Sequence, residues 1–216
     1  MNETLKAARL DFSLVRPYMK TMLFIMVFPV VFAAMNRSLL NGISFAMCFI
    51  GMTAGYTFSI SEKNGMERLY GILPISKKHM VIGRYLYTCT IGLLTLMISL
   101  IAHPIVLHAL GVSVSPVDII AAAIAGIILF SLYTVFLLPG YYKYGAIKGR
   151  LFMLFPVAVY LVVLTSASIF GFTGSPVLSA IIGNPLIFVI IVLLICIMAF
   201  LLSIVVSIRI FQNKEA

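Results

Sequence analysis

The chain lacks tryptophan and holds few acidic residues and few cysteines. Its 216 residues include six Asp or Glu, three Cys and no Trp. Cys48, Cys89 and Cys196 fall inside apolar runs without the CxxC spacing of metal or redox sites, so we interpret them as packing residues. The chain has no HExxH zinc motif, no paired acids within an apolar run and no Ser–His pair with a third orienting residue. These absences argue against an intramembrane enzyme and against a resident cofactor or metal.

The chain consists mainly of long apolar runs. Hydrophobic residues make up 62% of it, and the mean hydropathy is +1.17. A run of about 20 apolar residues crosses a bilayer as a helix. Runs of about this length lie at 18–35, 40–60, 85–110, 117–138, 151–170 and 185–208. They predict an all-α integral membrane protein with six spans in one domain, residues 1–216, and leave no room for a soluble catalytic domain.

The basic residues lie on one side of these runs. All but one of the 15 Lys and Arg residues fall before or at the start of the first run, in the second and fourth connections or after the last run. The exception is Arg37. Basic connections stay in the cytoplasm, so both termini are predicted to be cytoplasmic. The net charge of +9 fits anionic lipid better than nucleic acid, because the basic residues are dispersed.

Residues 1–17 predict an amphipathic helix at the cytoplasmic membrane interface. Leu5, Ala8, Phe12 and Val15 recur at helical spacing, and basic residues occupy the opposite side. A lipid anchor that orients the first span and an elbow helix that also contacts a partner protein both fit this pattern.

Small residues and a short apolar loop mark two further segments. Gly51 and Gly55 lie four residues apart, which allows close approach of helices. They predict either a subunit seam between two copies or packing within one bundle. Residues 171–184 enclose the short and mostly apolar stretch 177–182, which cannot cross a bilayer, and they predict an outer re-entrant loop. His103 could line a substrate path or bond a neighbour near the outer interface, and its role stays open.

The second connection carries the clearest local signal. Asn64 and Glu67 have the spacing of a capping box, Pro74 stops the helix, and Ser76 can cap the next one. The apolar stripe of this short helix consists of Met66, Leu69, Tyr70 and Leu73. Presented to the cytoplasm, such a stripe needs lipid headgroups or a soluble partner protein to bury it.

These residues also carry a resemblance. The strings Gly65-Met66-Glu67-Arg68-Leu69-Tyr70, Leu73-Pro74-Ile75-Ser76-Lys77 and Arg84-Tyr85 are similar to the loop in small bacterial ABC-2 type permeases, the transmembrane subunits of ABC exporters. The resemblance is closest to permeases of phenol-soluble modulin exporters and of antimicrobial-peptide export or immunity systems. It implies that residues 62–73 are the coupling helix, which docks in a groove of the ATPase subunit. Residues 64–70 would form that helix, and Glu62 would lie at its base.

The resemblance implies partners as well. Two permease chains, alike or different, would join two ABC ATPase subunits in a bacterial cytoplasmic membrane, with ATP and Mg on the ATPase. This chain has no GxxxxGK(S/T) phosphate loop, so the ATPase must be a separate chain. The cargo would be amphipathic or cytolytic peptides or other hydrophobic molecules. Val177 and Ile181 in the re-entrant loop would gate its release.

Two other functions compete with export. A substrate-capturing membrane subunit of a vitamin importer has a similar size and six spans, and it would bind a vitamin by itself. A peptide-immunity or sensor protein would bind a toxic peptide without moving it, and the sequence does not separate that function from transport.

Overall fold

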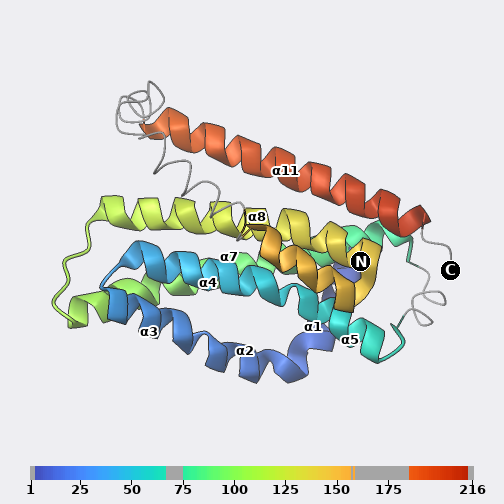
Figure 1. Cartoon of the computed structure of the whole chain (residues 1–216), viewed down its shortest axis with the longest axis horizontal. Helices are drawn as coiled ribbons and strands as arrows, with labels where there is room; N and C mark the ends of the chain where they lie inside the picture. Colours follow the sequence, from blue (N-terminus) through green and yellow to red (C-terminus); the bar gives the residue numbers. More distant parts are fainter. Residues whose placement is uncertain (1–2, 67–74, 157, 159–184, 214–216) are drawn as a thin grey trace.

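The computed structural model describes residues 3–66, 75–156, 158 and 185–213, and every element in these ranges is a helix (Figure 1). Five helical stretches are long and apolar enough to cross a membrane. The predicted all-α membrane class is therefore confirmed for the part of the chain that the structure describes. Most of the predicted span at 151–170, and all of the predicted re-entrant loop with Val177 and Ile181, lie outside the described residues.

The predicted interface helix and the first span form one bent series of helices. It consists of α1 (Glu3–Val15), the 3-10 turn η1 (Arg16–Tyr18), α2 (Met19–Ile25) and α3 (Val27–Asn36). Pro29 has no amide hydrogen, and it lies in the first turn of α3, where that hydrogen is not needed. The break at Met26 gives the span the shape of an arc, with α2 on its outer side (Figure 1).

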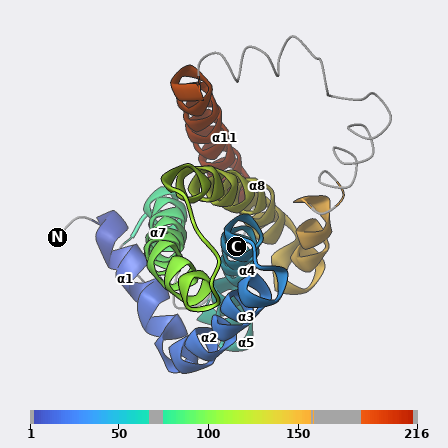
Figure 2. The same ribbon diagram turned by 90° about the vertical axis from the view of Figure 1, so that its left-hand side faces the viewer.

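The centre of the bundle is the second span. It is formed by α4 (Leu39–Thr53) and α5 (Gly55–Lys63), and α4 lies between α3, α7 (Lys77–Ala109) and α8 (Pro116–Gly149) (Figure 2). Ile43, Met47 and Leu107 are buried in this core. Ser38, Ser76 and Ser115 each accept a hydrogen bond from a backbone N–H at the start of α4, α7 and α8. The predicted cap at Ser76 is confirmed.

The chain reverses direction near the end of α8. Gly145 has φ 77° and ψ −176° and interrupts the helical geometry there. The residues after it, including η2 (Arg150–Met153), return along α8, and the rings of Tyr144 and Phe152 stack with centroids 5.5 Å apart. The predicted boundary between the fourth and fifth spans therefore lies at this turn.

The last helix, α11 (Pro185–Asn213), joins the bundle through polar contacts within its second half. The Tyr85 hydroxyl of α7 lies 2.6 Å from Ser203 Oγ and 2.9 Å from Ser207 Oγ. Ser203 Oγ also lies 2.9 Å from the Val135 carbonyl of α8, to which it donates. Three helices are thus joined through one serine.

The two ends of the bundle differ in charge. Figure 1 places α1, the end of α5, the start of α7, the Gly145 turn and the end of α11 at one end. We call this the basic end, because Lys6, Lys63, Lys77, Lys148 and Arg209 lie on these elements. Arg37 lies at the opposite end, where it closes α3 in a left-handed conformation.

The packing of α1 and of the two glycines can be compared with the predictions. On α1, the predicted apolar face is divided, because Val15 is buried while Leu5 and Phe12 are exposed, and the buried face also contains Asp11. Gly51 and Gly55 are buried within the chain, where a Cβ would meet Tyr133 and Tyr141 of α8 respectively. This intrachain packing is one of the two alternatives that the sequence left open, and a subunit seam at the two glycines stays a prediction.

His103 lies inside the bundle. Its side chain is 1% exposed, and Nδ1 lies 2.9 Å from the backbone carbonyl of Ser99. The ring packs against Gly42 of α4 and interacts with the backbone of Pro29 in α3. His103 therefore contacts the carbonyl of Ser99, while its packing partners come from α3 and α4.

Candidate functional site

Helices α1, α5, α7 and α8 meet at the basic end, next to the connection between α5 and α7. We call this meeting point the basic junction and define it by Asp11, Phe58, Glu62, Arg84 and Tyr142. These residues line one cavity of about 70 Å³. Because α5 ends at Lys63, one residue after Glu62, the connection that follows α5 is attached to the bundle at this junction.

The strongest contact of the junction is a buried ion pair between α1 and α7. Arg84 Nε donates to Asp11 Oδ2 at 3.1 Å and Arg84 Nη2 donates to Asp11 Oδ1 at 3.0 Å. Asp11 is 3% exposed and Arg84 is 7% exposed. A two-point contact of this kind fixes orientation as well as distance. The position of α1 is therefore tied to the start of α7.

The guanidinium group also contacts aromatic rings. Arg84 Cζ lies 4.3 Å from the ring centroid of Phe58 on α5 and 5.8 Å from that of Tyr142 on α8. The rings of Phe58 and Tyr142 meet edge to face with centroids 4.9 Å apart. Both contacts favour the charged guanidinium in a site from which water is largely removed. One arginine thus contacts three other helices.

A second polar contact joins α5 to the turn at the end of α8. Glu62 Oε1 accepts a hydrogen bond from the backbone N–H of Ala146 at 2.7 Å. The neighbouring Gly145 leaves space for this carboxylate, since a Cβ there would collide with Glu62 Oε1. The end of α5 and the reversal after α8 are therefore held together next to the connection.

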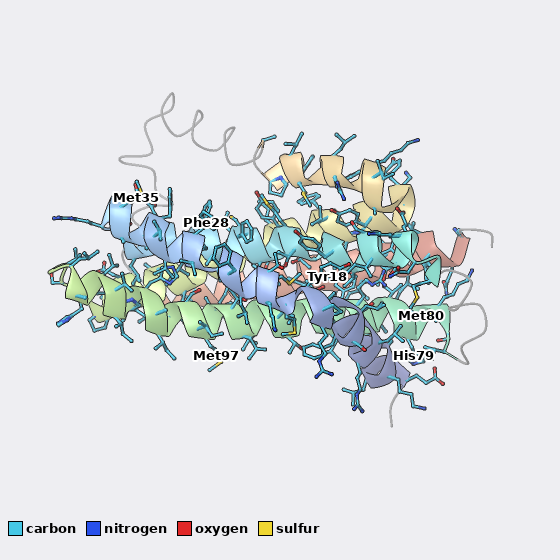
Figure 3. All side chains as sticks on the ribbon, turned by 90° about the horizontal axis from the view of Figure 1, so that it is seen from below. Tyr18, Phe28, Met35, His79, Met80 and Met97 are labelled. Atoms are coloured by element: carbon cyan, nitrogen blue, oxygen red, sulfur yellow. The ribbon has the colours of Figure 1, made fainter. Side chains whose placement is uncertain are left out.

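The far end of the connection is tied to α1. His79 Nδ1 lies 3.0 Å from Glu3 Oε2 and 2.6 Å from Ser76 Oγ. Figure 3 shows His79 and Met80 beside α1. These groups are partly exposed, so the contact is weaker than the pair at Asp11. Both ends of the connection are nonetheless attached to the same group of helices.

The predicted coupling helix starts differently from the prediction. Glu62 and Lys63 form the last turn of α5, and Asn64 is the C-cap of that helix. Gly65 follows with φ 59°, the left-handed conformation that commonly ends a helix. Residues 62–73 are therefore not one continuous helix, because the chain turns at Asn64 and Gly65. Met66 is the first helical residue after the turn.

The remaining predicted residues of this helix lie outside the described part of the chain. They are Glu67, Arg68, Leu69, Tyr70 and Leu73. Of the predicted site residues, only Glu62 is in the basic junction, while Asn64, Gly65 and Met66 continue from it into the connection.

Sequence reasoning missed Asp11 and the role of Arg84. The predicted spans place Arg84 in the basic connection, yet it lies more than one turn inside α7. A cation within an apolar helix usually needs a partner. Only six acids are present in the chain, so a search for that partner among them could have identified Asp11.

Among the described residues, no three His, Cys, Asp or Glu side chains come together in a way that could hold a metal ion.

Comparison with known proteins gives one result. The family described as "ABC-2 family transporter protein" matches residues 9–212. No curated protein and no solved structure matches the chain.

Proposed function

Because this chain belongs to the ABC-2 family of transporter proteins, we propose that it is the permease of an ATP-driven exporter. The family makes it the membrane component of an ABC-2 transporter, with the ATPase on a separate chain. Our proposal adds the direction of transport, the cargo class and the mode of coupling. It places two permease chains, alike or different, against two ATPase subunits in a bacterial cytoplasmic membrane, with both termini in the cytoplasm.

The basic junction is the observation that carries the proposal. A contact that transmits force must be rigid, and the connection 64–76 begins and ends at side chains attached to α1, α5, α7 and α8. Docking of an ATPase on this connection would pull on four helices together. The coupling residues would be Asn64, Gly65 and Met66, followed by Glu67, Arg68, Leu69, Tyr70 and Leu73, with Glu62 at their base.

The cargo class is inferred from the charges near the membrane. Within the described ranges the acids are Glu3, Asp11, Glu62 and Asp118. Asp11 is paired with Arg84, and Asp118 caps the start of α8. An ion-driven transporter normally keeps acids within its spans. An apolar path driven from outside the bilayer suits amphipathic peptides or other hydrophobic cargo, released past an outer gate at Val177 and Ile181.

Coupling can be tested with a charge placed in the connection. In the permease reconstituted with its ATPase, Met66→Asp or Tyr70→Asp should abolish most cargo-stimulated ATP hydrolysis. The reason is that a carboxylate would have to be buried in an apolar groove of the ATPase. The matched control is Ser113→Asp, which adds the same charge in the connection at the opposite end of the bundle.

Three outcomes separate the candidate functions. Loss of stimulation with normal membrane insertion supports docking through this connection. Full stimulation in both variants contradicts it. Peptide binding without ATP-dependent movement in the unaltered complex would favour an immunity or sensor protein instead.

The orientation can be tested by labelling single cysteines. In a background with Cys48, Cys89 and Cys196 replaced by alanine, cysteines at Ser38 and Ser113 should react with an impermeant reagent from outside the cell. Cysteines at Lys77 and Lys148 should react only after the membrane is opened, because basic connections stay in the cytoplasm. Labelling of Lys77→Cys in intact cells would invert the proposed topology.

A further inference from the structure

The arc of the first span leaves a groove between α2 and α7. Helices α1 and α3 both pack against α7, and α2 lies between them on the outer side of the arc (Figure 1). Figure 3 shows the first span crossing α7, with Tyr18 near the start of α2. The resulting cavity has a volume of about 180 Å³. It is separate from the basic junction, whose cavity shares no lining residue with it.

Flexible apolar side chains line the groove. One wall carries Met19, Met22 and Met26, and the other carries Ile91, Leu94 and Ile98. Unbranched methionines adapt to an occupant of variable shape. The rim opens outward, since Leu23 is 63% exposed and Leu94 is 51% exposed. A helix with its side chains is about 10–12 Å wide, so the groove suits an extended alkyl chain rather than a helical peptide.

The mouth of the groove toward the basic end carries positive charge. Arg16 and Lys20 flank Met19 in the sequence, and both are exposed. Basic side chains beside a membrane helix attract anionic lipid headgroups. No acidic residue lies in the chain between Asp11, which is already paired with Arg84, and Glu62.

We propose that this groove is a binding site for an anionic phospholipid. One acyl chain lies between α2 and α7, and the phosphate contacts Arg16 and Lys20. The lipid would fill the space that the arc leaves and support α2 against α7. This inference does not depend on the cargo or direction of transport.

The absence of tryptophan gives a sensitive test on the full-length protein. A Leu23→Trp variant places a fluorophore at the rim of the groove. A Met97→Trp variant places one on the far side of α7, where Met97 is 56% exposed and does not line the groove (Figure 3). Each variant is placed in nanodiscs of phosphatidylcholine with a minor fraction of phosphatidylglycerol brominated on its acyl chains, which quenches nearby tryptophan.

The expected result is quenching of Leu23→Trp at a far lower brominated fraction than Met97→Trp requires. We expect the groove to prefer phosphatidylglycerol to phosphatidylcholine by about thirtyfold, which corresponds to about 2 kcal/mol from two basic side chains. Adding Arg16→Gln and Lys20→Gln should remove the preference. The same loss of charge at exposed sites elsewhere, Lys78→Gln with Lys148→Gln, should leave it unchanged.

Two results would overturn the proposal. Equal quenching of both variants in proportion to the bulk brominated fraction would mean that the groove holds ordinary bilayer lipid. Relief of quenching by an added amphipathic peptide, with no effect of Arg16→Gln and Lys20→Gln, would mean that a peptide occupies the groove.

Discussion

Replacing Asp11 with alanine should lower the free energy of unfolding by about 3–5 kcal/mol, because it leaves the buried charge of Arg84 without its carboxylate. The change can be measured as a shift of the denaturant midpoint in detergent or bicelles. Transport should fall together with stability, since α1 would no longer be fixed to α7. The matched control is Glu3→Ala on the same helix, whose exposed pair with His79 should contribute about 0–1 kcal/mol.

A double variant separates the ion pair from simple packing. Asp11→Leu combined with Arg84→Met should recover much of the stability that either change loses alone, because apolar residues can replace a buried ion pair at little cost. Strictly additive losses would show that the two side chains do not depend on each other, contrary to the geometry of the basic junction.

Replacing Gly145 with alanine should cost about 2–4 kcal/mol. With φ 77° and ψ −176° the backbone occupies a region open almost only to glycine, which accounts for about 1–3 kcal/mol. The added Cβ would also displace Glu62 Oε1 from the Ala146 N–H, a bond that contributes about 1 kcal/mol. The combined cost can be measured as the change in the free energy of unfolding of the purified permease.

Two further variants separate the backbone strain at Gly145 from the loss of the Glu62 hydrogen bond. Gly65→Ala serves as the control, because Gly65 has φ 59° but no atoms close to the position of a Cβ, and it should lose only about 1–2 kcal/mol. Combining Gly145→Ala with Glu62→Ala should cost little more than Gly145→Ala alone. A loss of stability no larger than that of Gly65→Ala would mean that the backbone at Gly145 accepts alanine without the strain and the collision with Glu62 described above.

The sequence was sufficient for the membrane class and for most helix positions, because length and apolarity decide both. It is insufficient for the inward face of α1, where Asp11 is buried beside Val15 and pairs with Arg84, while Leu5 and Phe12 face outward. In a lipid environment apolar side chains can face outward without cost, so hydrophobic periodicity marks the lipid side as readily as the core. The turn at Gly145 likewise depends on a carboxylate that lies 84 positions before Ala146 in the chain.

The two glycines show another limit of what the sequence can predict. Gly51 and Gly55 did indicate a close approach between helices, and that approach exists. A spacing of small residues does not name the opposing helix, because Tyr133 and Tyr141 lie about 80 residues further along the chain and carry no complementary pattern. Only the folded arrangement identifies α8 as their partner.

The pairing of Asp11 with Arg84 also has a consequence for biosynthesis. The two residues are separated by 73 positions, and a ribosome adds about 5–20 residues per second. Asp11 therefore emerges roughly 4–15 seconds before its partner is made, while the first two spans are entering the bilayer. During this interval Asp11 has no Arg84 to pair with, so α1 is not yet fixed to the rest of the bundle. The third span completes the docking of the first, so the N-terminal helix reaches its final position only after the start of α7 has left the ribosome.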